Sequence, residues 1–175
     1  MTKQCLYITA DQIAAPSGGG VVTANELQAL REFAAEREME CEAWGREELE
    51  WNGSDPWKWD ARAKSRYHGR KWTDSDDVRD SMRDAPSLAH LYAGTFSSVI
   101  ESLQYNKCKV TYTAAAHDVA KSRQAHLDLG LEYNYPHLTD PVLWERYLAG
   151  YKSADVLICP STHSRDVMRG FGCTN

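Results

Sequence analysis

Short runs of strand-forming residues alternate with longer segments of helical pattern, and this alternation constrains the fold more than any other feature. The strand-like runs lie near residues 5–9, 41–44, 88–93, 109–113 and 155–159. In the segments between them apolar residues recur at helical spacing, as at Phe96, Val99, Ile100 and Leu103. Strands that alternate with helices pair in parallel, because each crossover helix returns the chain to the same end of the sheet. The sequence therefore predicts an α/β fold, with a doubly wound, mostly parallel sheet and helices on both faces.

Turn signals predict where the helices start. Thr23-Ala24-Asn25-Glu26 fits a capping box near the start of the first helix, although that helix could also begin directly after Gly20. Thr95 is a candidate cap, and Pro141 stands where a first helical residue is expected. Residues 45–86 are polar, rich in Trp and without a clear period, which predicts an insertion carrying a short helix over 74–83.

Composition and charge exclude several classes of protein. The 175 residues suit a single domain, and contents of 42% hydrophobic and 26% charged residues are typical of a soluble globular chain. A net charge of -5 argues against general nucleic-acid binding, which requires a basic surface. No apolar run approaches the roughly 20 residues of a membrane span, and a strand-like run follows the N-terminus at once, so we expect a cytoplasmic protein without a signal peptide. The five cysteines form no Cys-x-x-Cys pair and are expected to be small buried hydrophobes.

Two polar features follow predicted strands. Gly18, Gly19 and Gly20 come after the first strand, and the pair His117-Asp118 comes after the strand at 109–113. Ligands of open α/β sheets bind beyond the carboxyl ends of the strands, so these residues are candidates for ligand binding and catalysis. The alternatives are a plain flexible turn for the glycines and a helix cap, or packing against Tyr112, for His117.

The segment from Pro160 to Arg165 opens the last predicted helix with hydroxyls, an imidazole and a guanidinium. Ser161, Thr162 and Arg165 are candidate substrate contacts, although helix capping alone would account for the hydroxyls. His90 lies within a strand and is predicted to be a core histidine with satisfied hydrogen bonds. The spacing of the remaining histidines matches no metal motif, so neither a metal nor a cofactor is expected. The basic and Trp-rich stretch at 57–72 is interpreted as a solvated insertion rather than a polyanion site.

Three of these segments together resemble the N-terminal, acceptor-side domain of retaining GT-B glycosyltransferases of the family-4 type. The first is Gly18-Gly-Gly20 leading into Asn25-Glu26-Leu27, and the second is Thr113-Ala-Ala-Ala-His117-Asp118. The third runs from Tyr151-Lys-Ser-Ala-Asp155 through Ser161 to Phe171-Gly172, and resembles the family's helix, strand and following helix. The matching parts are 1–35 and 87–172, whereas 45–86 match nothing.

The resemblance implies one Rossmann-like half, spanning 1–175, of a two-domain enzyme whose active site lies between the halves. The enzyme would move a sugar from a nucleotide-sugar donor to an acceptor hydroxyl with retention of configuration. Gly18 to Gly20 would lie under the donor diphosphate and the acceptor, and His117 would position the transferred sugar or the acceptor hydroxyl. The donor-binding domain is expected to be absent from this chain, so the chain alone is expected to be inactive. The acceptor's identity stays open.

Two other functions remain possible from the sequence. The chain could be a non-catalytic module that binds a sugar or a partner on a Rossmann-like scaffold. It could also be an unrelated nucleotide-binding enzyme, although a Gly-x-Gly-x-x-Gly fingerprint is missing.

Overall fold

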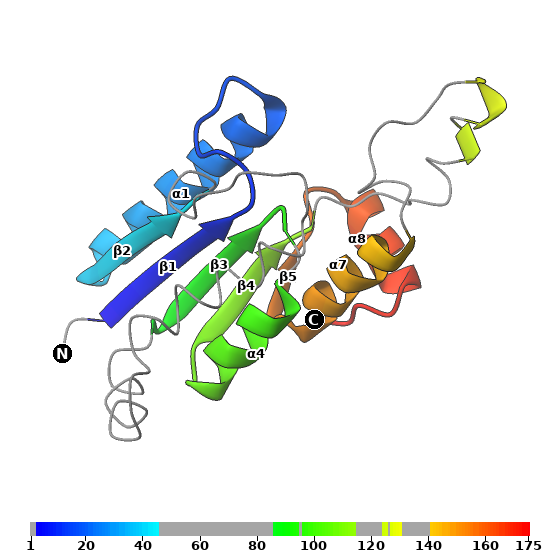
Figure 1. The fold of residues 1–175 in the computed structure, drawn as a ribbon. Helices are drawn as coiled ribbons and strands as arrows, with labels where there is room; N and C mark the ends of the chain where they lie inside the picture. Colours follow the sequence, from blue (N-terminus) through cyan, green and yellow to red (C-terminus); the bar gives the residue numbers. More distant parts are fainter. Residues whose placement is uncertain (1–2, 46–85, 95, 115–123, 126, 131–140) are drawn as a thin grey trace.

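A computed structural model describes residues 3–45, 86–94, 96–114, 124–125, 127–130 and 141–175 (Figure 1). The elements are, in chain order, β1 (Lys3–Thr9), α1 (Gly18–Glu36), β2 (Met39–Trp44), β3 (Leu88–Tyr92), α4 (Ser97–Tyr105), β4 (Lys109–Thr113), α7 (Pro141–Ser153), β5 (Val156–Ile158) and α8 (Thr162–Gly170).

The strands form one five-stranded sheet in the order β2-β1-β3-β4-β5, and every neighbouring pair is parallel. The chain first steps from β1 to β2 and then crosses to the other side of β1, from where β3, β4 and β5 follow outward. Such a reversal beside the first strand is the arrangement of doubly wound, Rossmann-like sheets. The predicted fold class is confirmed, including the strand at 41–44, which forms the C-terminal part of β2.

Each face of the sheet buries its own apolar core, because successive strand residues point to opposite faces. Leu6 and Ile8 of β1 belong to the core that also contains residues of α4, α7 and α8. Cys5 and Tyr7 belong to the core under α1. Figure 1 shows α1 on one side of the sheet and α4 and α7 on the other. The two cores account for helices on both faces.

The helical pattern of α4 is confirmed in its buried face, whereas Phe33, which the spacing placed on the apolar face of the first helix, is exposed. Phe96, Val99, Ile100 and Leu103 are each fully buried, and α7 begins at Pro141 as expected. The prediction for the start of the first helix was wrong, because α1 begins at Gly18, after a cap at Ser17 whose side chain accepts the N–H of Gly20. The glycine triplet is therefore the first turn of the helix and not a loop before it.

Some predictions fall on residues outside the described ranges. These are the insertion at 45–86 except its two end residues, its short helix at 74–83, the cap at Thr95, the pair His117-Asp118, and most of the helix expected from about Val119 to Leu129. All five cysteines are free, and Cys5, Cys108 and Cys173 are buried. Among the described helices, none is long and apolar enough to cross a membrane.

Candidate functional site

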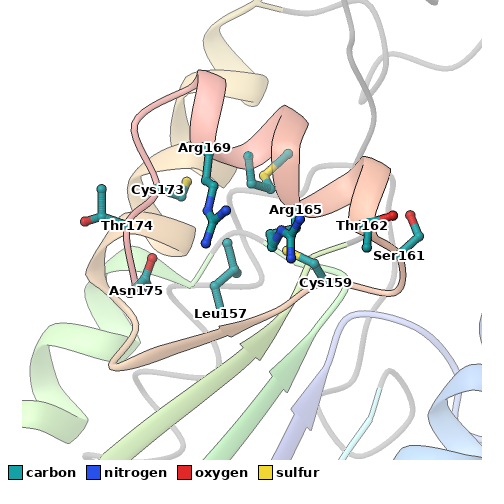
Figure 2. Close-up of a pocket in the computed structure, with 10 residues that line it drawn as sticks. Leu157, Cys159, Ser161, Thr162, Arg165, Arg169, Cys173, Thr174 and Asn175 are labelled. Atoms are coloured by element: carbon teal, nitrogen blue, oxygen red, sulfur yellow. The ribbon is translucent and has the colours of Figure 1, made fainter.

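A pocket lies along the groove between edge strand β5 and helix α8 (Figure 2). Its volume is about 400 Å³, which is enough for a small ligand. The lining residues come from β5, from α8 and from the segment after α8: Leu157, Cys159, Ser161, Thr162, Arg165, Met168, Arg169, Cys173, Thr174 and Asn175. We call this cavity the α8 pocket. It brings together all three predicted contacts of the last helix, Ser161, Thr162 and Arg165.

Ser161 sets the start of the helix that forms one wall of the α8 pocket. Its backbone is extended, with φ -153° and ψ 164°, and its Oγ accepts the N–H of Ser164 at 3.0 Å. A serine in this position satisfies one of the free N–H groups of the first turn, which stabilises the helix. Ser161 is therefore a helix cap, as the simpler interpretation of the sequence held, and it also lines the pocket.

Two arginines give the α8 pocket its charge. Arg165 and Arg169 are one helical turn apart, and both project from α8 toward β5 (Figure 2). Arg165 donates from Nε and Nη2 to Asp166 at 3.1 Å, but both partners are about half exposed, so this ion pair is weak. Arg169 makes no ion pair with any residue in the part of the chain that is described. Like charges one turn apart repel each other, and an anion bound between them would remove that repulsion.

Two thiols line the same pocket without adding charge. Burial raises the pKa of the Cys159 thiol, and the nearby Arg165 and Arg169 only partly oppose this effect. Burial likewise raises the pKa of Cys173, against the opposing effect of Lys152. Both thiols are therefore neutral at pH 7, and the field in the pocket comes from the guanidinium groups and the positive end of α8.

The glycine turn lies at the end of β1 and outside the α8 pocket. β3 and β4 separate β1 from β5, although parallel pairing puts the ends of all these strands at one edge of the sheet. A side chain at Gly20 would overlap backbone atoms of Ala15, so the absence of a Cβ there is explained by packing of the preceding loop on the helix. At Gly18 no atom of the described residues lies within 4 Å of the Cβ position, so within that part of the chain this glycine is open to an approaching molecule.

Asp11 adds a negative charge beside the glycine turn. Its carboxylate packs against Gly19, at the positive end of α1. Burial, together with the charge of Asp11, raises the pKa of Tyr147 to about 12. The carboxylate of Asp11 repels an anionic ligand group at this turn and favours ligand hydroxyls, because it accepts hydrogen bonds from them.

The described residues contain part of the predicted site. Ser161, Thr162 and Arg165 share one pocket, the glycines form a helix turn at the same edge, and His117 and Asp118 lie outside the described ranges. Arg169 and Asn175 were missed, although the spacing of Arg169 from Arg165 was a readable sign that both lie on one helix face. Within the described ranges, no group of three or more His, Cys, Asp or Glu side chains could hold a metal ion.

No family model, curated protein or solved structure matches the chain. A fold of this kind serves many unrelated functions, so the pocket and its chemistry bear on the function more than the fold does.

Proposed function

We propose that the chain is the acceptor-side domain of a retaining glycosyltransferase and that the α8 pocket binds the acceptor. The observation that carries the proposal is the convergence of Ser161, Thr162 and Arg165 on one pocket beside the end of a parallel strand. The sequence singled out these residues because they open the last predicted helix directly after a strand.

The chemistry of the pocket suits a ligand that carries hydroxyl groups and a negative charge. Thr162 supplies a hydroxyl, which both donates and accepts hydrogen bonds. Asn175 can offer its amide oxygen as an acceptor, because its amide nitrogen donates to the carbonyls of Tyr151 and Ala154. Arg165 and Arg169 supply planar donors that bind phosphate or carboxylate oxygens in pairs. A sugar bearing a phosphate group combines both requirements, and the acceptor hydroxyl would face the same edge of the sheet as the glycine turn and Asp11.

The proposal is tested by titrating the isotope-labelled chain with three probes and following its amide signals by NMR. The probes are glucose 6-phosphate, glucose and UDP-glucose. We expect glucose 6-phosphate to shift the signals of α8 and of residues 173–175, glucose to do so more weakly, and UDP-glucose to leave them in place. Arg169→Gln should weaken glucose 6-phosphate binding. Arg37→Gln is the matched control, because Arg37 is exposed and pairs with Glu36 at the end of α1.

The outcomes separate the competing functions. Tight binding of UDP-glucose to this chain alone would favour a self-sufficient nucleotide-binding enzyme and overturn the acceptor role. An absence of any response from α8 to both sugar probes would also overturn it. If Arg37→Gln weakened binding as much as Arg169→Gln, the ligand would lie outside the α8 pocket.

A further inference from the structure

A network of hydrogen-bonded polar side chains crosses the face of the sheet that α1 covers, away from the α8 pocket. His90, in the middle of β3, is only 7% exposed. Its Nε2 lies 3.3 Å from Glu26 Oε2 of α1, and its Nδ1 lies 2.8 Å from Thr111 Oγ1 of β4. Tyr7 of β1 donates its hydroxyl to Glu26 at 3.0 Å and stacks on the imidazole, with ring centroids 5.6 Å apart. The network thus connects strands β1, β3 and β4 with helix α1.

Strand register brings these side chains together. Tyr7 is paired with His90 across β1 and β3, and His90 is paired with Thr111 across β3 and β4, so all three point to the same face. Burying an imidazole or a carboxylate costs free energy unless the group is hydrogen-bonded, and each polar group of this network has a partner within it. Burial, reinforced by Glu26, raises the pKa of Tyr7, so its hydroxyl remains a donor to the carboxylate at neutral pH.

The two ends of this network lie on α1 and β4, which both reach the same edge of the sheet. Glu26 lies on the helix whose first turn is Gly18 to Gly20. Thr111 lies on β4, which ends at Thr113, and Thr113 Oγ1 lies 3.4 Å from His90 Nε2. In the sequence, His117-Asp118 follows this strand. His90 thus contacts both α1, through Glu26, and β4, through Thr111 and Thr113.

We infer that His90 is a positioning residue, which sets the glycine turn of α1 relative to the end of β4 through Glu26 and Thr111. The biological purpose of this positioning rests on the proposed function, because α1 and β4 both reach the edge of the sheet where the acceptor would react. Its physical content is a coupling between α1 and β4. A histidine that only filled space would transmit no change from one element to the other.

The experiment uses the isotope-labelled 175-residue chain and the variants Glu26→Gln, Thr111→Val and Thr111→Ser. We expect Thr111→Val to shift the amide signals of Gly18 to Gly20, and Glu26→Gln to shift those of Thr113 and Ala114. Thr111→Ser keeps the hydroxyl and should restore the wild-type glycine signals. Glu32→Gln is the control, because Glu32 is on the same helix but exposed, where it accepts a hydrogen bond from Gln28.

The inference is overturned if Thr111→Val shifts only signals of β4 and its neighbours, or if Thr111→Ser shifts the glycine signals as much as Thr111→Val does. Shifts from Glu26→Gln no larger than those from Glu32→Gln would overturn it as well. If Glu26→Gln does not fold, the comparison of Thr111→Val with Thr111→Ser still decides the matter. Glucose 6-phosphate binding to the α8 pocket is measured separately, so a failure of the proposed function is distinguishable from a failure of the coupling.

Discussion

The three consecutive glycines of α1 show how neighbouring residues of one type can have different reasons to be present. Gly20 faces the backbone of Ala15, Gly19 faces the carboxylate of Asp11, and Gly18 faces no atom of a described residue within 4 Å. A Cβ at Gly20 would require the loop backbone to move, whereas a Cβ at Gly19 meets the end of a side chain that can turn away. Only Gly18 keeps the property that the sequence suggested for all three, which is room for a ligand to approach the backbone.

A pair of substitutions tests this difference. We expect Gly20→Ala to lower the free energy of unfolding by about 1–3 kcal/mol, as overpacking against a fixed backbone does. Gly18→Ala should be neutral or stabilise by up to about 1 kcal/mol, because alanine loses less backbone entropy in a helix. Urea denaturation of both variants checks the prediction. An equal loss at both positions would contradict it.

At the scale of elements, the sequence predicted which faces are buried better than where the elements begin. Apolar spacing reports on burial directly, so the stripe of α4 and the strands of the sheet were correct. The start of α1 was missed because Thr23 looked like a cap. Its hydroxyl instead donates to the carbonyl of Gly20 and accepts the N–H of Ala14, so it holds the preceding loop against the helix. Such a contact depends on how the loop folds back, which local propensity does not contain.

The candidate site was predictable to the extent that it depends on local features. Ser161, Thr162 and Arg165 stood out because a helix start after a strand is visible in the sequence. The contact of His90 with Glu26 and Thr111 was not visible, because it joins residues that meet only once strands β3 and β4 are paired and α1 lies across them. Its prediction as a satisfied core histidine was correct in burial and in having partners.

The N-terminus of α8 permits a separation of structural and binding roles. Ser161→Ala removes the side chain that caps the helix, and we expect it to lower the free energy of unfolding by about 1 kcal/mol. Thr162→Ala removes a pocket hydroxyl that takes no part in this cap, so its cost should stay within about 0.5 kcal/mol. Thermal unfolding, followed with glucose 6-phosphate titration, measures both effects. Equal destabilisation by the two changes would mean that Ser161 is not the effective cap.

Asp155 connects the start of β4 to the start of β5 and makes stability depend on pH. Although burial acts against it, the N–H of Val110 at 2.8 Å and the ammonium of Lys109 at 3.2 Å lower the pKa of Asp155. A lowered pKa in the folded state stabilises the fold above the unfolded value of about 3.9, and this stabilisation is lost as the pH falls through the folded pKa.

We therefore expect Asp155→Asn to reduce the difference in unfolding free energy between pH 7 and pH 3, by up to about 1 kcal/mol because the pair is partly exposed. Urea denaturation at the two pH values measures this difference. Asp128→Asn is the control, since Asp128 is exposed and accepts a hydrogen bond only four residues away, from Gln124. A pH dependence unchanged by Asp155→Asn would show that other carboxylates carry it.

At the scale of the whole molecule, the α8 pocket is positively charged although the protein has a negative net charge. The chain has 25 acidic and 20 basic residues, yet Arg165 and Arg169 line one cavity with the positive end of α8. A local cluster of positive charge on a negatively charged protein indicates an anionic ligand, because the cluster attracts anions that the rest of the molecule repels. Exposed arginines are also screened by salt, so glucose 6-phosphate binding should weaken as the ionic strength rises.

The isolated chain is expected to have no transferase activity of its own. Glycosyltransferases of the family that the sequence resembles hold the nucleotide-sugar between two Rossmann-like halves, and the described residues supply one sheet. Under the proposed function, the donors that stabilise the developing charge on the leaving diphosphate would belong to the other half, and this electrostatic term is commonly the largest in catalysis. We expect the pure 175-residue chain to release no UDP or GDP from UDP-glucose or GDP-mannose above the rate in buffer, even with glucose 6-phosphate present. Amide spectra of the same sample verify that the protein is folded, and a heat-denatured sample sets the background. Nucleotide release that depends on the folded chain would show that one sheet suffices, and the division of donor and acceptor between two domains would have to be abandoned.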